Sequence, residues 1–315
     1  MTDIVVTGAG TAVDGLRGPA DLLAPYRRHE GGFDPETGLR GKHLRHRDRA
    51  SRLASRAVEA ALTEAGLFGE NRSYLGESER TATVVSTNLG NLDSICSFLD
   101  TIAEEDAEAL NPTALPNTSS NVTAGWIAIE HGFRAANLTV SNGPTSGLDA
   151  LHWARRLIRA GRADTVVVTG VEPDNEPVRT LLGDNGEQPW PDVAAAVVVE
   201  SGAAAQRRGA RIRLGLGAYR RADDVDTAVA VLPADQSAIL LAEGDSRTEE
   251  VIDLAAWAGR QSGALGVLQC VAACAAFEIS ARSRAAGAAL ATSCRLPGAA
   301  AAAMVFTAPH RTNSE

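Results

Sequence analysis

Residues 138–161, LTVSNGPTSGLDALHWARRLIRAG, combine hydroxyl side chains with a sharp turn between two regular elements. The first residues alternate in character as a strand does, and an amphipathic helix begins directly after the turn. Many enzymes hold a nucleophile on such a strand-to-helix turn, which is called a nucleophile elbow. Here the position that should carry the nucleophile is Pro144.

Pro144 also weakens the electrostatic part of such a site. A proline has no backbone N–H, so it cannot donate a hydrogen bond to the oxyanion of a tetrahedral intermediate. Loss of one such donor typically lowers the rate by a factor of about 100 to 1,000. Proline is nevertheless well suited to the first turn of a helix. The sequence therefore predicts an elbow that is structurally sound but chemically inactive.

Three hydroxyl residues close to this proline are candidates for a replacement nucleophile, namely Ser141, Thr145 and Ser146. A hydroxyl becomes reactive when a base lies within hydrogen-bond reach. The chain has no histidine between His152 and His310, and Lys42 is its only lysine. We expect His152, two turns along the same helix, to pack or to face solvent. A hydroxyl nucleophile is therefore disfavoured.

Strands and helices alternate along the chain, as expected for a layered α/β protein. In the first half, strands are predicted at 3–10, 81–91, 137–141 and 163–172, with helices at 48–67 and 92–105, from about 121, and after the elbow. The second half repeats this order with two strands in 193–222, a strand, turn and helix in 235–259, a buried helix in 263–287 and two strands in 287–308. We expect two pseudo-repeated halves, 1–172 and 173–315, in one compact unit.

The composition excludes several classes of protein. The 315 residues, 44% of them hydrophobic, are enough for a large core, and a net charge of −9 argues against nucleic-acid binding. No apolar run could span a bilayer and the start of the chain lacks signal-peptide features, so we expect a cytoplasmic protein without membrane contact. The cysteines have no metal-ligand spacing, which predicts buried thiols and no metal or cofactor: Cys96, Cys270, Cys274 and Cys294.

Two other stretches suggest binding sites. The arginine-rich residues 39–56, LRGKHLRHRDRASRLASR, are either an anion site or a solvated loop leading into a helix, and we favour the loop. The glycines of VVTGAGTAVDG, residues 5–15, are similar to a dinucleotide-binding loop but lack the Gly-x-Gly-x-x-Gly spacing. The single lysine also has no tyrosine four residues before it. A nucleotide-binding oxidoreductase is therefore the weaker alternative.

Five segments in this order resemble the β-ketoacyl synthase family, whose members have the thiolase fold. They are IVVTGAG, LRGKHLR with DRASRLASRAVEAALTEAGL, NLTVSNGPTSGLDALHWARRLIRAGRADTVVVTGVE, AAAVVVESGAAAQRRGARI and GRQSGALGVLQCVAACA. Each segment is weak evidence alone, but all five in register make a specific match over nearly the whole chain. The resemblance implies a five-layered α/β/α/β/α fold built from two pseudo-repeated halves.

The resemblance also implies that the family's catalytic residues are missing. A working ketosynthase uses an elbow cysteine, which a carrier-bound thioester acylates, and two histidines and a lysine that support decarboxylation and condensation. At these positions this chain has Pro144, Glu243, Arg260 and Ala255. Glu243 and Arg260 replace groups that face each other in the family's site, which makes them candidates for a buried ion pair.

Family members without the cysteine include the chain length factors of type II polyketide synthases, and the resemblance implies this role. A chain length factor is a non-catalytic subunit that forms a heterodimer with an active ketosynthase, and an acyl carrier protein serves the resulting acyltransferase complex. The corresponding interface strand contains Asn137, Leu138, Thr139 and Val140. The corresponding end wall of the acyl tunnel contains Leu92, Ile95, Cys96, Leu99 and Leu115, with Phe98 as a candidate gate. A compact subunit of this kind would fit antibiotic biosynthesis of a reduced or polyene chain.

Two other interpretations remain open. Each wall candidate is also explained as an ordinary core residue of a short amphipathic helix. The whole chain is also explained as a standalone degenerate thiolase-fold protein that binds an acyl chain or an acyl carrier protein. An obligate subunit should expose a large apolar face and behave poorly alone, whereas a standalone binder should be a soluble monomer or homodimer.

Overall fold

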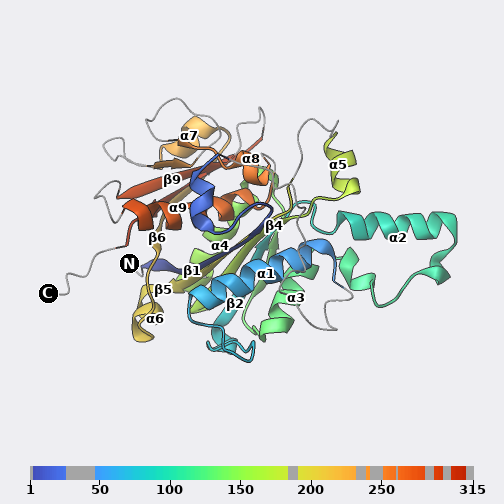
Figure 1. The fold of residues 1–315 in the computed structure, drawn as a ribbon, viewed down its shortest axis with the longest axis horizontal. Coiled ribbons are helices and arrows are strands. Elements are labelled where there is room, and N and C mark those ends of the chain that lie inside the picture. The colour runs from blue at the N-terminus through green and yellow to red at the C-terminus, as the bar shows by residue number, and fades with distance from the viewer. Residues whose placement is uncertain are drawn as a thin grey trace.

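The computed structural model describes residues 3–25, 47–183, 191–231, 239–241, 251–259, 262–280, 287–293 and 299–309. Figure 1 shows a mixed α/β structure with strands running through the middle of the molecule and helices on either side of them. The ten described strands form one continuous sheet in the order β3-β2-β4-β5-β1-β6-β10-β9-β7-β8. The predicted α/β class is therefore confirmed.

The main elements follow one another in the predicted alternation. The first ten are β1 (Ile4–Val13), α1 (Arg49–Glu64), β2 (Thr81–Ser86), α2 (Leu92–Glu104), α3 (Val122–His131), β3 (Asn137–Val140), α4 (Ser146–Arg159), β4 (Thr165–Glu172), α5 (Glu176–Leu182) and β5 (Val193–Ser201). They are followed by α6 (Gly202–Arg207), β6 (Leu214–Ala222), α7 (Val225–Val229), β7 (Ile239–Leu241), β8 (Val251–Ile252), α8 (Ala255–Ala258), α9 (Leu265–Ser280), β9 (Ala288–Ser293) and β10 (Ala301–Thr307).

The strand order contains an internal repeat. Strands β1 to β5 are arranged 3-2-4-5-1, and strands β6 to β10 have the same arrangement. The strand directions repeat as well. In the order 3-2-4-5-1, the first three strands of each set are parallel to one another, and the last two are joined by antiparallel pairing. By this criterion β5 belongs to the first half. The strand order groups β5 with the first set of strands, and the halves 1–172 and 173–315 stay a prediction.

The sheet folds around a central helical layer. Strands β1 and β6, which join the two repeats, are paired only at Val5 with Gly215 and Val6 with Leu214. Helices α4 and α9 pack against strands of both repeats, while α1 and α3 cover the outer side of the first repeat and α7 covers the second. Three buried clusters fill the spaces between these layers. The result is the α/β/α/β/α layering expected from the resemblance.

Helix α1 shows how local sequence determines this packing. The Asp48 carboxylate caps its N-terminus by accepting a hydrogen bond from the Ser51 N–H at 2.6 Å. Gly8 and Gly10 lie inside β1, and a Cβ atom at either position would collide with the α1 backbone. These glycines therefore allow a close strand-helix approach. They do not form the loop that dinucleotide binding requires, and the strand continues to Val13.

Two local predictions are wrong. The stretch predicted as a strand, turn and helix in 235–259 contains a second short strand, β8, which pairs in parallel with β7 before the four-residue helix α8. The arginines expected in a solvated loop include Arg47, which is 4% exposed and donates to Glu130 at 2.7 Å, beneath the ring of Trp126. The neighbouring Arg49 pairs with Asp192 at 2.8 Å. Both residues hold α1 to other elements, and residues 39–46 lie outside the described part.

The crossing of α4 and α9 depends on two glycines. A Cβ atom at Gly266 would meet the backbone of Gly147 and Leu148, and a Cβ atom at Gly147 would meet the backbone of Gly266. We expect Gly266→Ala to lower the free energy of unfolding by about 1 to 3 kcal/mol, because backbone atoms cannot move aside as a flexible side chain can. Urea unfolding measures this effect.

Gly125→Ala is the matched control for this substitution. Gly125 lies inside α3, and a Cβ atom there would have no neighbour within 4 Å. Alanine should stabilise α3 by about 0.5 to 1 kcal/mol through helix propensity alone. Equal stability of Gly266→Ala and the wild type would contradict a backbone-limited helix crossing.

Candidate functional site

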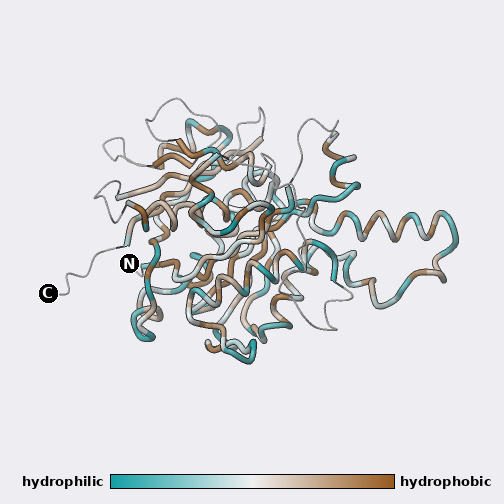
Figure 2. The backbone as a smooth tube through the Cα atoms, viewed as in Figure 1, coloured by the Kyte–Doolittle hydropathy of each residue, from teal (hydrophilic) through white to brown (hydrophobic). Residues whose placement is uncertain are grey.

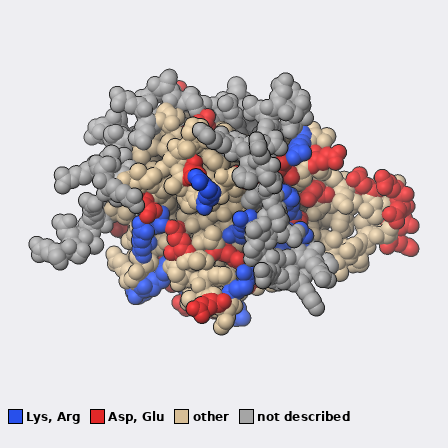
Figure 3. Space-filling model, viewed as in Figure 1, with Lys and Arg blue, Asp and Glu red and all other residues tan. Residues whose placement is uncertain are grey.

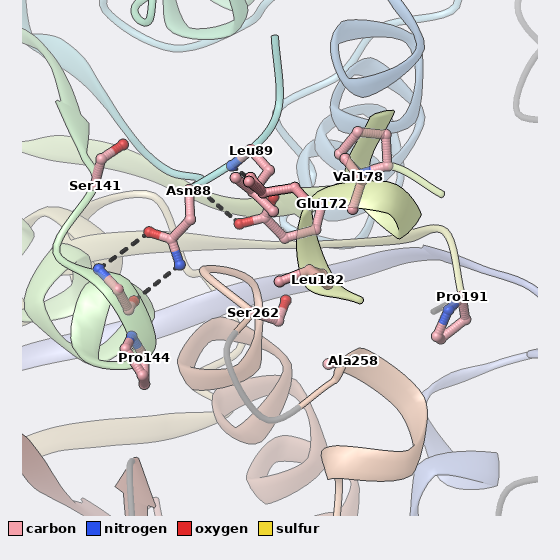
Figure 4. A pocket seen from close by; sticks show the side chains of 13 residues that line it. Asn88, Leu89, Ser141, Pro144, Glu172, Val178, Leu182, Pro191, Ala258 and Ser262 are labelled. Atoms are coloured by element: carbon pink, nitrogen blue, oxygen red, sulfur yellow. Dashed lines mark hydrogen bonds between the residues drawn. The ribbon is translucent and has the colours of Figure 1, made fainter. Parts of the chain in front are cut away.

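The predicted elbow is present between β3 and α4. Gly143 has a φ of 71°, in the left-handed region that favours glycine, and Pro144 follows at the start of the helical turn that leads into α4. The Asn88 side chain brackets this turn, because its Nδ2 donates to the Gly143 carbonyl at 3.0 Å and its Oδ1 accepts from the Gly143 N–H at 3.2 Å (Figure 4). The elbow is therefore held from the loop that follows β2.

A cavity of about 430 Å³ opens beside the elbow. Its walls come from the ends of β2 and β4, from the elbow, from α5, and from the segments around α8. The lining residues are Asn88, Leu89, Ser141, Gly143, Pro144, Glu172, Pro173, Val178, Leu181, Leu182, Pro191, Ala258 and Ser262. Figure 4 shows the side chains of Pro144, Glu172, Ser262 and Ala258 around this space. The site is thus an open and mainly apolar cavity.

Two of the four expected degenerate positions are described. Pro144 is half-buried and lines the cavity. Ala255 begins α8, whose last residue, Ala258, lines the cavity, while Ala255 itself does not. Glu243 and Arg260 lie outside the described residues, so the ion pair between them stays a prediction.

The three hydroxyls near Pro144 all have structural partners. Ser141 donates to the Thr87 carbonyl, and Ser146 donates to the Gly143 carbonyl at 2.8 Å. Thr145 donates to the Asp149 carboxylate at 2.9 Å. These bonds stabilise the elbow and the first turn of α4.

Asp149 is a carboxylate that the sequence analysis missed as a neighbour of these hydroxyls. Its separation of four residues from Thr145 on one helix was the available signal, because such residues face the same side. Asp149 is 5% exposed and also accepts hydrogen bonds from Asn142, at 2.8 Å, and from Tyr219. Neither Thr145 nor Asp149 lines the cavity. The pair therefore has the hydrogen bond of an activated hydroxyl but no access to a substrate in the cavity.

The histidines of the described part do not supply a base to the cavity. His131 is 5% exposed and stacks on Phe133, and burial lowers its pKa to about 4, so it is neutral at physiological pH. His152 stacks on Tyr219 with ring centres 4.2 Å apart, and burial lowers its pKa as well. His152 therefore packs, which is the first of the two alternatives expected for it.

Glu172 is the most unusual group in the cavity wall. It ends β4, is 8% exposed, and accepts backbone hydrogen bonds from Asn88 at 2.5 Å, Leu89 at 3.0 Å and Gly263 at 3.0 Å. Burial raises the pKa of Glu172 to about 7, although the three N–H donors partly oppose this shift. The carboxylate ties the loop after β2 and the start of α9 to the end of β4. The sequence signal was a lone acidic residue at the end of a strand that has no other charged residue.

The raised pKa of Glu172 predicts a pH dependence of stability. Because the folded-state pKa of about 7 exceeds the reference value of 4.5, the folded state binds more protons between these values, and its stability falls as pH rises through this window. The contribution of Glu172 should decrease by about 2 to 3 kcal/mol between about pH 4.5 and pH 7.5. Urea unfolding across this range should show a shallower slope for Glu172→Gln. Identical slopes in both proteins would contradict the assigned pKa.

The expected wall residues do not line the cavity. Leu92, Ile95, Cys96 and Phe98 are half-buried, and Leu99 and Leu115 are 60% and 56% exposed. No residue of α2 is buried, so their interpretation as core residues does not hold in this chain. Helix α2 projects from the body of the molecule (Figure 1). A role of these residues as a tunnel wall would require a second chain.

The expected interface strand lies at an open edge. β3 is the first strand of the sheet and, among the described strands, pairs only with β2. The Ala136 and Val140 carbonyls accept hydrogen bonds from β2, at Thr83 N (2.9 Å) and Thr87 N (3.1 Å). The alternation along a strand therefore directs the backbone groups of Asn137 and Thr139 away from the sheet.

The described residues contain neither a metal-binding cluster nor a membrane-spanning helix. No group of histidine, cysteine, aspartate and glutamate side chains in that part could hold a metal ion. None of its helices combines the length and apolar character needed to cross a membrane. Cys270 and Cys274 are buried free thiols as predicted, Cys96 is half-buried, and Cys294 lies outside the described part.

Comparisons of the sequence with known proteins identify β-ketoacyl synthases as relatives of this chain. The family model described as β-ketoacyl synthase, N-terminal domain, matches residues 15–187. The 3-oxoacyl-[acyl-carrier-protein] synthase 2 of Vibrio cholerae is 27% identical over 203 residues, which cover 58% of this chain and 48% of that protein. A protein named granaticin polyketide β-ketoacyl synthase 1, from Streptomyces violaceoruber, is 27% identical over 262 residues, covering 69% of this chain and 62% of that protein. The chain thus spans about half the length of the first of these relatives.

Solved structures show the same fold. A type II polyketide synthase acyl-carrier protein in complex with its ketosynthase bound to the hexaketide matches with a TM-score of 0.79 and 19% identity, over 98% of this chain and all of that chain. The ishigamide ketosynthase/chain length factor matches with a TM-score of 0.77 and 21% identity, with the same coverage. At these identities the likeness shows the fold, which is the thiolase-like fold of ketosynthases.

Proposed function

The chain belongs to the β-ketoacyl synthase family, and from this premise we propose that it is a non-catalytic chain length factor of a type II polyketide synthase. In this role it forms a heterodimer with an active ketosynthase and shapes the end of the tunnel in which the partner's acyl chain grows. The observation that carries the proposal is Pro144, which occupies the nucleophile position of an otherwise intact elbow.

The arrangement around Pro144 supports a protein that has lost chemistry and kept its framework. Asn88 brackets the turn, and the Glu172 carboxylate connects three chain segments in the wall of the same cavity. The cavity remains open, but its described lining contains no cysteine, histidine or lysine. A cysteine nucleophile with an imidazole base therefore cannot form among these residues.

Two adjoining surfaces support a partner chain. The open edge of β3 can extend the sheet across an interface, which is a common mode of chain association. Apolar residues recur along one face of α2 at Leu92, Ile95, Leu99 and Ile102, and Figure 2 shows this hydrophobic colouring on the projecting helix. Leu99 and Ile102 are 60% and 46% exposed, as expected for a helix face that a second protein covers.

The charge distribution is consistent with a partner that covers the apolar face of α2. Figure 3 shows acidic side chains gathered over the far end of the α2 region, whereas tan surface lies between that end and the body. Asp100, Glu104, Glu105, Asp106 and Glu108 are exposed there. Such a charged end stays in water, or meets a basic rim, while the apolar face packs.

Two of the similar structures provide the partner classes. One is named as a ketosynthase with a chain length factor, and the other as an acyl-carrier protein in complex with its ketosynthase. We carry both classes to this chain within the proposal: an active ketosynthase as the direct partner, and an acyl carrier protein that reaches the complex through it. Type II polyketide synthesis is the corresponding pathway class.

Co-expression with a catalytic ketosynthase encoded beside this chain tests the proposal. Size-exclusion chromatography with mass detection should show a one-to-one complex that neither protein forms alone. A stable homodimer that ignores the ketosynthase would overturn the heterodimer.

That second outcome would favour the standalone alternative. The open apolar cavity next to Pro144 is the observation behind it, because a cavity of about 430 Å³ can enclose a small acyl group without reacting with it. A standalone binder should take up a fatty acyl thioester without the ketosynthase, and Leu182→Trp should block this uptake by filling the cavity.

Substitution of Leu99 tests the tunnel-wall role within the reconstituted complex. The side chain is 60% exposed in the isolated chain, so truncation should leave its stability within about 0.5 kcal/mol. If the partner's tunnel ends at this residue, Leu99→Ala should shift the products toward longer chains, which mass spectrometry measures. Asp100→Ala, at the next position of α2, is the control and should leave the product profile unchanged. An unchanged profile for both variants would remove Leu99 from the wall.

A further inference from the structure

A second cavity, of about 470 Å³, lies at the other end of α4. The elbow cavity meets the first turn of α4, and this cavity meets the last turns, at Arg155 and Arg159. The helix has 14 residues, so the two cavities are separated by about 20 Å along its axis. The starts of β1 and β6 and the end of β10 form the opposite walls. We call this space the Arg155 cavity.

Arg155 is a buried cation without an ion-pair partner among the described residues. Three arginines are buried in the described part of the chain, namely Arg47, Arg155 and Arg213. Arg47 pairs with Glu130 at 2.7 Å, and Arg213 pairs with Glu278 at 2.7 Å. Arg155 is 6% exposed, its Nε is buried without a hydrogen-bond acceptor, and no described carboxylate forms an ion pair with it.

The neighbouring Arg159 makes this arrangement less favourable in the absence of an anion. It lies one turn beyond Arg155 on the same face of α4, and like charges at this spacing repel. Burial and the Arg159 charge lower the pKa of Arg155 to about 10, so Arg155 remains protonated at physiological pH. The partial negative charge of the helix C-terminus accounts for the exposed Arg159, but not for a buried guanidinium with an unused donor.

The cavity offers both charge and apolar walls. Asp3 is the one carboxylate among the described lining residues, and it is exposed on the opposite wall. The two guanidinium groups therefore give the cavity a net positive charge. Apolar side chains, including Ile4, Val5, Ile212 and Leu216, cover much of the remaining surface. Two adjacent guanidinium groups match the charge of about −1.5 to −2 and the several acceptor oxygens of a phosphate monoester.

We propose that the Arg155 cavity binds a small organic phosphate, with the phosphate held by Arg155 and Arg159 and the organic part against the apolar walls. A carboxylate shares part of this chemistry but carries a single charge. This site is independent of the elbow and of any partner chain.

Calorimetric titration of the full chain at constant ionic strength tests the site with inorganic phosphate, phenyl phosphate and benzoate. We expect one site per chain, tighter binding of phenyl phosphate than of inorganic phosphate, and weaker binding of benzoate. Arg155→Gln and Arg159→Gln should each weaken phenyl phosphate binding by about 10-fold to 100-fold, as for a lost hydrogen bond to a charged group. Arg159 is exposed, so that variant should fold even if Arg155→Gln does not.

Arg156→Gln is the matched control on the same helix. Arg156 lies over the Trp153 ring, 5.2 Å from its centre, and does not line the cavity. This variant should bind phenyl phosphate like the wild type. The assignment is overturned if wild-type protein binds neither phosphate, if Arg159→Gln binds as tightly as wild type, or if benzoate binds as tightly as phenyl phosphate.

Discussion

Thr139→Pro should strongly weaken the proposed pairing with a ketosynthase while leaving the chain itself folded. The backbone N–H of Thr139 points away from β2, so its loss removes no hydrogen bond within the sheet. A partner strand at this edge would lose a donor and meet the proline ring. We expect the dissociation constant of the complex to rise by at least about 30-fold, equivalent to about 2 kcal/mol.

Thr139→Val is the matched control for this experiment. It keeps the N–H and the branched side chain, and it removes a hydroxyl that is buried without a hydrogen-bond partner. The complex should therefore form as with the wild type. Circular dichroism and the melting temperature of each variant alone separate loss of pairing from loss of folding. A Thr139→Pro chain that is folded and still pairs would exclude β3 as the interface strand.

The second large effect is expected for Glu172→Ala, which should destabilise the chain by about 3 to 5 kcal/mol or prevent folding. The substitution leaves the N–H groups of Asn88, Leu89 and Gly263 without their carboxylate acceptor. Each buried donor left unsatisfied costs about 1 to 3 kcal/mol, unless water enters from the cavity. The segment that carries Asn88 also brackets the elbow, so the damage should extend to the turn at Gly143.

Glu176→Ala and Glu172→Gln complete this test. Glu176 is exposed in the first turn of α5, and its replacement should change the free energy of unfolding by less than about 0.5 kcal/mol. Glu172→Gln keeps one acceptor oxygen and should fall between the other two variants. A Glu172→Ala chain as stable as the Glu176→Ala chain would show that these hydrogen bonds contribute little to stability.

The elbow keeps its architecture through residues other than Pro144. The framework here depends on Asn88, Glu172 and the glycines of the α4–α9 crossing. Pro144 cannot supply a thiol or a backbone N–H at the elbow, and it is well suited to the helical turn that it begins.

The sequence alone determined the main elements, the layering and the presence of a proline at the elbow. Apolar periodicity reports burial on one side of a strand or helix, and it therefore predicted β1, α1, β2, α4, β4 and α9 near their observed positions. The absence of a nucleophile is also a property of composition, since a proline cannot supply a thiol or an N–H in any fold. Short elements such as β8 were missed because two residues carry no periodic signal.

Only the tertiary structure decided which side chains meet. It assigned β5 to the first repeat through strand pairing, and it placed Glu172 beneath three N–H donors that come from two distant segments. It also left α2 without buried residues, and it buried the Nε of Arg155 without an acceptor among the described residues. These features depend on contacts between residues far apart in the chain, and local sequence patterns contain no information on which distant groups a buried charge or an exposed helix face will find.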